Sequence, residues 1–197
     1  MQFWRIFATA LVLLSLAAGP AAEAGAETQR SSFLLWAKPA KPKPHRTRAV
    51  VSYRTGESPG TVIVETKSHS LYLVLPGAKA IRYAVGVGRE GFAWSGTARI
   101  ARRAEWPAWY PPREMVERAA ARSQFVPYRI DGGDLNPLGA RALYLHDGGR
   151  DTLYRIHGTN EPRSIGRNVS SGCIRLLNED IIDLYDRVAL GAKVIVR

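Results

Sequence analysis

Two side chains capable of covalent chemistry, His157 and Cys173, lie in one loop-rich segment near the C-terminal end of the chain. Cys173 is the single cysteine, so the chain cannot form an intramolecular disulfide. A thiol without a disulfide partner is either buried and inert or accessible and used, and the small neighbours Ser171 and Gly172 favour access. Because an imidazolium lowers the pKa of a nearby thiol and an imidazole accepts its proton, the pair predicts a cysteine nucleophile with a histidine base.

The residues around Cys173 suit the other needs of acyl transfer. Backbone N–H groups of the turn formed by Ser171, Gly172 and Cys173 can hold an oxyanion, and glycine permits close approach. Arg175 follows two residues later, and the sequence leaves open whether it meets a substrate carboxylate or forms a structural ion pair. The competing interpretation, a buried structural thiol and a core histidine, is disfavoured because both residues occur together in this segment.

The sequence predicts neither a metal nor another cofactor. One cysteine excludes a zinc site built from several thiolates, and the only histidines are His45, His69, His146 and His157. Residues 86–91 match the dinucleotide-binding pattern G-x-G-x-x-G, but the residues that follow do not begin a helix and no strand–helix–strand unit is visible. We therefore expect these glycines to shape a loop on the substrate side.

Short runs rich in β-branched and aromatic residues predict strands from about Gly60 onward. Turn signals separate the runs at hairpin-like spacing, which predicts mostly antiparallel pairing. The fold class is therefore expected to be mainly β, an antiparallel β-sandwich-like domain with a few short helices. The expected strands are Thr61–Val64, Leu71–Leu75, Ile81–Val85, Leu143–Leu145, Leu153–Ile156 and Val194–Val196.

Two helices are expected among these strands. An alanine-rich segment predicts one helix over Arg113–Arg122. A second helix is expected to begin with Asn178 as its N-cap and to end at Gly191. Its apolar residues recur at helical spacing and predict one buried face, made of Ile181, Leu184, Tyr185 and Val188.

The N-terminal end has the layout of a secretory signal peptide. Arg5 precedes an uncharged apolar run, which is shorter than the roughly 20 residues that span a bilayer, and small-residue cleavage sites follow near Ala24. We expect residues 1–24 to be a cleaved signal peptide, with an uncleaved anchor as the alternative. Residues 25–59 are rich in lysine, arginine and proline and predict an extended linker, and residues 60–197 form the expected catalytic domain.

The chain is strongly basic, with 28 Lys and Arg against 17 Asp and Glu and a formal net charge of +11. The predicted signal peptide holds one residue of each sign, Arg5 and Glu23, so the exported protein keeps this charge. Export to the periplasm or cell wall favours anionic wall polymers or a membrane surface as electrostatic partners, and argues against nucleic acid. The alternative is a soluble cationic surface without a specific partner.

Several segments resemble the YkuD-type family of bacterial L,D-transpeptidases. The resemblance rests first on HGTNEP at 157–162, SSGCIR at 170–175 and NEDIIDLYDRV at 178–188. Upstream, VGVGREGFAWSG, EWPAWYPP and NPLGARALYL are also similar to family segments, so the resemblance covers nearly all of Gly60 to Arg197. Ser171 departs from the family pattern, because many members carry a histidine there.

The resemblance implies a reaction on peptidoglycan stem peptides. Cys173 would attack the bond after the L-centre of diaminopimelate in a tetrapeptide stem and expel the terminal D-alanine, giving a thioester. His157 would be the base, oriented by the backbone carbonyl of Gly158 rather than by a carboxylate. The acyl group would then pass to the amine of an acceptor stem in a 3-3 cross-link, to an outer-membrane protein, or to water in an L,D-carboxypeptidase reaction.

Two other functions compete with this one. A papain-like wall peptidase places its cysteine before its histidine, whereas His157 precedes Cys173 here. A non-catalytic peptidoglycan-binding module, in which Cys173 is unreactive, remains the alternative from another functional class.

Overall fold

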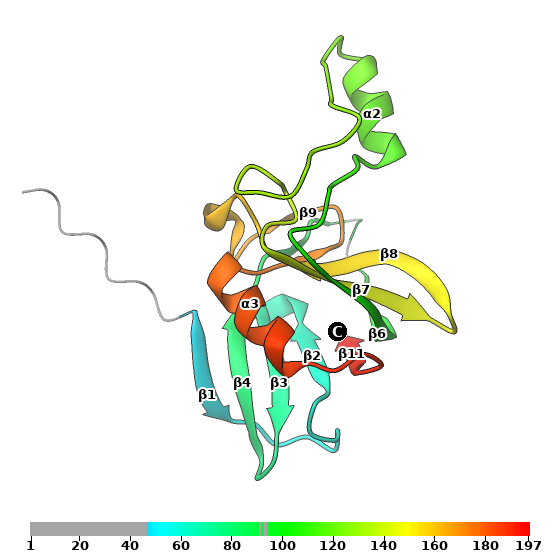
Figure 1. Cartoon of the computed structure of the whole chain (residues 1–197). Helices are drawn as coiled ribbons and strands as arrows, with labels where there is room; N and C mark the ends of the chain where they lie inside the picture. The colour runs from blue at the N-terminus through cyan, green and yellow to red at the C-terminus, as the bar shows by residue number, and fades with distance from the viewer. Residues whose placement is uncertain (1–46, 91, 93) are drawn as a thin grey trace, which may run out of the picture. The chain divides into compact units, whose positions relative to one another are not determined.

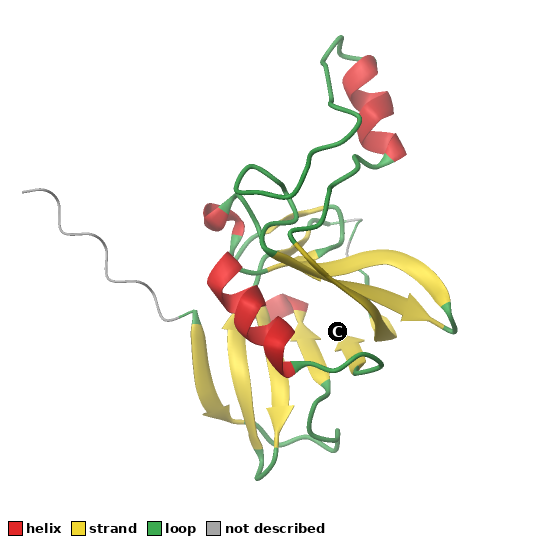
Figure 2. Cartoon of the chain, viewed as in Figure 1, coloured by secondary structure: helices red, strands yellow, loops and turns green. Residues whose placement is uncertain are grey.

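The computed structural model of the protein describes residues 47–90, 92 and 94–197 (Figure 1). The predicted signal peptide, most of the predicted linker and His45 lie outside the described residues. The described chain is mainly β, as the sequence predicts, with few helices (Figure 2). Its strands are β1 Arg48–Ser52, β2 Val62–Glu65, β3 Ser70–Leu75, β4 Lys79–Ala84, β5 Val87–Gly88, β6 Gly96–Glu105, β7 Arg141–Asp147, β8 Arg150–His157, β9 Asn168–Ser170, β10 Ile174–Arg175 and β11 Lys193–Val196.

Nine of these strands form one sheet in the order β1-β4-β3-β2-β11-β6-β7-β8-β10. Most neighbours pair antiparallel, in agreement with the hairpin spacing of the sequence, while β2 with β11 and β8 with β10 pair parallel. Strands β5 and β9 form a separate parallel pair. The strands β8 and β10 of one parallel pair are separated by a long loop in the sequence. This loop lies between His157 and Cys173.

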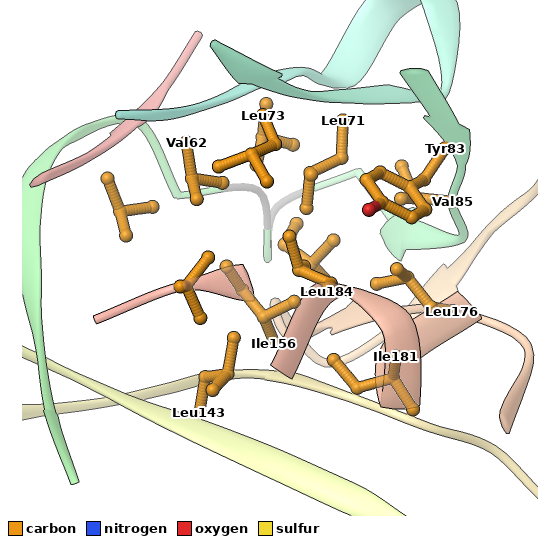
Figure 3. Close-up of a cluster of buried hydrophobic side chains, with 14 of the residues drawn as sticks. Val62, Leu71, Leu73, Tyr83, Val85, Leu143, Ile156, Leu176, Ile181 and Leu184 are labelled. Atoms are coloured by element: carbon orange, nitrogen blue, oxygen red, sulfur yellow. The ribbon is translucent and has the colours of Figure 1, made fainter. Parts of the chain in front are cut away.

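One hydrophobic core lies between the two halves of the sheet (Figure 3). Val62 and Leu71 of the first half and Ile156 of the second half are fully buried, and Leu184 of helix α3 fills the space between them. Burying a leucine or isoleucine side chain stabilises the fold by roughly 2 kcal/mol. The strands that carry the functional motif are therefore held by the same core as the rest of the domain.

Helix α3, Asn178–Arg187, begins where the sequence predicts a helix but differs from the expectation at both ends. Its N-cap is Leu177, and no side chain caps it, because the Asn178 side chain bonds to other segments. The helix ends at Arg187, earlier than the expected Gly191. Its buried face agrees with the prediction and consists of Ile181, Leu184 and Tyr185, with Val188 buried just beyond the last turn.

The sheet begins earlier in the chain than expected. Strand β1 lies within the segment predicted to be linker, and it pairs antiparallel with β4 along its whole length. Its first residue, Arg48, also forms an ion pair with Asp183 of α3, at 3.3 Å. The proline-rich composition that predicts a linker ends before this point, and a five-residue strand at a sheet edge leaves too short an apolar pattern to stand out in the sequence.

A long insertion, residues 106–140, connects β6 to β7 and contains helix α2, Arg113–Ala120. The helix stands apart from the sheet in Figure 1. A backbone bridge between Trp109 and Ile130 closes the base of the insertion. The buried Asn136 donates from Nδ2 to the carbonyls of Pro107, Ile130 and Asp131, and so anchors the insertion at its C-terminal side.

Candidate functional site

The pairing of β8 with β10 brings the two candidate catalytic residues together. Arg175 lies opposite His157 in the parallel register. Extending this register to Cys173, which comes just before β10, sets it beside Arg155 of β8, on the same face as His157. Strands ~4.8 Å apart with a rise of ~3.3 Å per residue separate the Cα atoms of Cys173 and His157 by about 8 Å. The thiol itself lies 4.0 Å from the carbonyl oxygen of Leu153, two residues before Arg155.

The turn before Cys173 is held by a serine that the sequence analysis did not select. The Ser170 hydroxyl donates to the carbonyl of Cys173 at 2.6 Å, and the Gly172 N–H donates to the Ser170 hydroxyl at 3.1 Å. Gly172 has φ +110, and an added Cβ would meet the ring of Tyr154 and lie 2.8 Å from the carbonyl of Phe92. Glycine is therefore required here for both conformation and space.

The two predicted oxyanion donors of this turn differ in their availability. The Gly172 N–H is engaged by Ser170. The Cys173 N–H has no hydrogen-bond partner among residues 47–90, 92 and 94–197. Ser171, the third residue of the predicted oxyanion turn, is exposed, and it makes no side-chain hydrogen bond within the same part of the chain. The Cys173 N–H is thus the backbone donor that is available beside the thiol.

His157 ends β8 and is 4% exposed. Its Nδ1 lies 2.6 Å from the carbonyl oxygen of Gly158. A carbonyl only accepts, so Nδ1 carries the proton of the neutral ring and Nε2 is the unprotonated nitrogen. This arrangement leaves a basic nitrogen on a ring whose orientation is held by the backbone.

Asn178 fixes the segment that follows His157. Its Oδ1 accepts from the N–H of Ala140 at 3.0 Å and from the N–H of Thr159 at 3.2 Å. An added Cβ on Gly158 or on Gly139 would collide with the same oxygen. Three segments therefore meet at Oδ1 of Asn178: the start of α3, the start of β7 and the residues after His157. Gly139 and Gly158 must be glycines because a side chain at either position would occupy the space of this oxygen.

The site disfavours charge on both candidate catalytic side chains. Burial, followed by the positive charge of Arg175, lowers the pKa of His157 from 6.5 to about 4. Burial raises the pKa of the Cys173 thiol, although the backbone and guanidinium of Arg155 oppose this shift. The sequence leaves open whether an imidazolium lowers the pKa of the thiol or a neutral imidazole accepts its proton. The directions of the two pKa shifts favour a neutral thiol and a neutral imidazole at pH 7.

Two arginines flank the site and both are anchored by carboxylates. Arg175 donates to Glu161 at 2.7 Å, so the structural ion pair left open by the sequence is present. Arg155 donates to both carboxylate oxygens of Asp151, at 2.7 and 2.8 Å, and stacks over the ring of Tyr144. Nε of Arg175 is buried without a hydrogen-bond partner among the described residues, and both guanidinium groups place positive charge near the thiol.

The remaining histidines lie elsewhere. His69 follows a 3-10 turn at Thr66–Ser68, and its Nε2 lies 2.6 Å from Oδ1 of Asn168. His146 belongs to β7, near the β7–β8 hairpin turn, and lines a separate cavity of about 420 Å³. In the described part of the chain, no three His, Cys, Asp or Glu side chains are grouped so that they could hold a metal ion.

Gly86 and Gly88 of the G-x-G-x-x-G match lie beside Arg175 and Gly172, and not in a dinucleotide fold. Val87 and Gly88 form strand β5, and the Gly86 N–H and carbonyl exchange hydrogen bonds with Arg175. An added Cβ on Gly88 would lie 3.0 Å from Cα of Gly172. Trp94 stacks on Tyr154 with the ring centroids 5.1 Å apart, so it packs against the turn of the candidate nucleophile.

The sequence did not indicate that three residues support the site: Ser170, Asn178 and Arg155. Ser170 stands beside the selected Ser171 in the same motif, and only the hydrogen bonds distinguish the two. Asn178 has the signature of an N-cap, so its local pattern suggested a different role. Arg155 alternates with His157 along β8, and this spacing is the signal that could have identified it.

A mainly β fold with a buried histidine at the end of one strand and a cysteine just before the strand paired with it defines a class of candidate cysteine acyl-transfer domains. The sequence model of the YkuD family, described as "L,D-transpeptidase catalytic domain", matches residues 59–196. The chain belongs to this family of enzymes. It is 36% identical over 138 residues to the probable L,D-transpeptidase ErfK/SrfK of Escherichia coli K12, which covers 68% of this chain but 42% of that protein. The chain thus spans less than half the length of this curated relative.

Solved structures support the same fold. A structure of an L,D-transpeptidase from Mycobacterium smegmatis is 19% identical and aligns with a TM-score of 0.51, covering 70% of this chain and 58% of that one. A Brucella melitensis structure, described as a probable carnitine operon oxidoreductase, is 44% identical with the same TM-score and covers 80% of this chain and 96% of that one. Its description belongs to that protein alone.

Proposed function

We propose that this chain is an exported peptidoglycan L,D-transpeptidase. Cys173 takes an acyl group from a tetrapeptide stem, releases the terminal D-alanine and passes the acyl group to the amine of an acceptor stem, giving a 3-3 cross-link. The observation that carries the proposal is the pairing of β8 with β10, which puts the buried His157 and the residues directly after Cys173 on neighbouring strands. Membership in the L,D-transpeptidase family supports the bond type.

The neutral ground state of the site supports proton transfer during the attack rather than before it. A bond forms between Sγ and the carbonyl carbon of the diaminopimelate residue while the thiol proton moves to Nε2 of His157. The resulting imidazolium then gives this proton to the departing amine of D-alanine, which completes the thioester. The hydrogen bond from Nδ1 to the Gly158 carbonyl supports this cycle, because it keeps Nε2 as the accepting nitrogen.

The surrounding charges suit an anionic intermediate. Arg155 and Arg175 both favour negative charge at the thiol, and Arg175 disfavours positive charge on His157. The unengaged Cys173 N–H is available to the oxyanion. Positive charge that is fixed in place before the reaction stabilises the transition state without rearrangement, so these groups have an electrostatic role.

A second candidate reaction is hydrolysis of the same thioester, an L,D-carboxypeptidase activity. It is favoured by one observation, the partial exposure of Cys173, which lets water reach the acyl group. An amine of an outer-membrane protein is a further possible acceptor. Export to the periplasm or cell wall rests on the N-terminal sequence, and the net charge of +11 would support attraction to an anionic wall. The part of the chain that the structure describes has no helix long and apolar enough to span a membrane.

Intact-mass spectrometry of the full chain mixed with a disaccharide-tetrapeptide tests the proposal. The wild type should gain the mass of the stem without its terminal D-alanine, and Cys173→Ala should gain nothing. His157→Gln should slow adduct formation about 100-fold or more, because a positioned general base contributes at least this factor. Circular dichroism of both variants checks folding. Absence of an adduct on folded wild type, with stem binding retained, would instead support a non-catalytic peptidoglycan-binding module.

A further inference from the structure

A cavity of about 380 Å³ lies on the loop between β8 and β10, the same loop that separates His157 from Cys173. The loop includes the 3-10 turn η3, Pro162–Ser164. The cavity wall combines apolar and charged side chains and consists of Glu161, Pro162, Arg163, Ser164, Arg167 and Val169. None of these residues belongs to the candidate nucleophile turn itself.

The charge of this cavity is positive and unbalanced. The carboxylate of Glu161 is already engaged by Arg175 at 2.7 Å. Arg163 and Arg167 are exposed, and neither forms an ion pair or a side-chain hydrogen bond within the described residues 47–90, 92 and 94–197. By contrast, Arg155 is paired with a carboxylate. Two arginines without a carboxylate partner in this part of the chain therefore line one cavity.

The cavity adjoins the candidate nucleophile. Val169 of its wall is followed by Ser170, whose hydroxyl bonds to the carbonyl of Cys173 at 2.6 Å. On the other side, the Glu161–Arg175 ion pair links the cavity wall to β10, two residues after Cys173. A group bound in the cavity therefore lies beside the chain that carries the thiol.

We infer that Arg163 and Arg167 bind a carboxylate of a stem peptide whose acyl group or amine is presented to Cys173. This inference rests on the proposed function. Guanidinium groups match a carboxylate in charge and in planar geometry. The side chains of Pro162 and Val169 can contact the alkyl part of the same residue, which a small free anion would leave uncovered. The carboxylate belongs either to the donor or to the acceptor stem.

Binding is tested first, in a background that cannot react. Isothermal titration of the full-length Cys173→Ala protein with a tetrapeptide stem should show about tenfold or greater weakening when Arg163→Gln and Arg167→Gln are added together. The control is Arg54→Gln with Arg82→Gln, which removes the same charge from two exposed residues, one in the loop after β1 and one in β4. A stem peptide with amidated carboxylates should bind the Arg163→Gln/Arg167→Gln variant and the control variant equally weakly.

Two kinetic measurements show whether the two arginines bind the donor stem or the acceptor stem. If the donor carboxylate is held, the Arg163→Gln/Arg167→Gln protein with Cys173 intact should form the acyl-enzyme about tenfold more slowly. If the acceptor carboxylate is held, acylation should be unchanged while transfer to a carboxylated amine falls and hydrolysis rises. Equal stem affinity, acylation and transfer in this variant and the control would overturn the inference and leave the proposed function intact. A wild type that neither binds the stem nor becomes acylated would overturn both.

Discussion

At the scale of single residues, the main feature of the candidate site is that the side chains of His157 and Cys173 are kept uncharged. The pKa of His157 is lowered to about 4, and the pKa of Cys173 is raised, chiefly because both groups are surrounded by protein. In the proposed reaction, the rate would therefore depend on how accurately the thiol is oriented toward a substrate carbonyl, more than on a large population of thiolate. The hydrogen bonds of Ser170 hold the backbone of the turn that carries the thiol.

Replacing Ser170 should therefore matter more than replacing its neighbour. In Ser170→Ala, the Gly172 N–H and the Cys173 carbonyl lose their shared partner, and we expect acyl-enzyme formation to slow about tenfold or more. In Ser171→Ala, which changes an exposed side chain in the same turn, the rate should stay within about twofold. Time-resolved intact-mass spectrometry of both variants measures the rates. Equal rates would show that Ser170 does not position the thiol.

At the scale of secondary-structure elements, the site depends on where α3 meets the ends of β7 and β8. Asn178 begins the helix and accepts hydrogen bonds from Ala140 and Thr159, on two other segments. The oxygen of one side chain thereby connects three elements around His157. A helix N-cap would have stabilised α3 alone, so this residue stabilises the site instead of its own helix.

Removing this oxygen should loosen the segment after His157. Asn178→Ala leaves two N–H groups without an acceptor, and we expect a loss of about 2 kcal/mol or more in the free energy of unfolding. Asn178→Asp retains an accepting oxygen and should lose less. Urea unfolding measures the stability, and hydrogen exchange at the Thr159 amide reports the local effect. Unchanged exchange in Asn178→Ala would contradict the role assigned to this contact.

At the scale of the whole molecule, the buried neutral imidazole makes folding dependent on pH. The folded state holds the pKa of His157 at about 4, against 6.5 for the ordinary group. Below pH 6.5 the unfolded chain binds a proton that the folded protein excludes, so stability is complete above this pH and falls between about pH 6.5 and pH 4. Two and a half pKa units correspond to about 3 kcal/mol.

This dependence can be isolated from that of the carboxylates by comparison with a variant. Urea unfolding of the wild type should show about 3 kcal/mol more loss between about pH 7.5 and pH 4 than unfolding of His157→Gln. His69→Gln changes a half-buried histidine outside the candidate site and serves as the control for the loss of a histidine. Parallel pH profiles for wild type and His157→Gln would show that the buried histidine does not limit stability in acid.

Much of the fold could be predicted from local patterns. The strands around Leu71–Leu75 and Leu143–Leu145 and the buried face of α3 follow from the spacing of apolar residues, which reflects the period of each element. The edge strand β1 was missed because its short pattern follows a proline-rich segment and becomes clear only through pairing with β4. Periodicity is a property of neighbouring residues, whereas strand pairing depends on distant ones.

The residue types and motifs of the candidate site, including His157, Cys173 and the glycine before the cysteine, can be read from the chain alone. Three features become visible in the folded protein: the β8–β10 register, the support of the turn by Ser170 and not Ser171, and the direction of the pKa shifts. The physical reason is the same in each case. Register, hydrogen-bond partners and burial depend on which distant segments meet, and the chain order does not specify them.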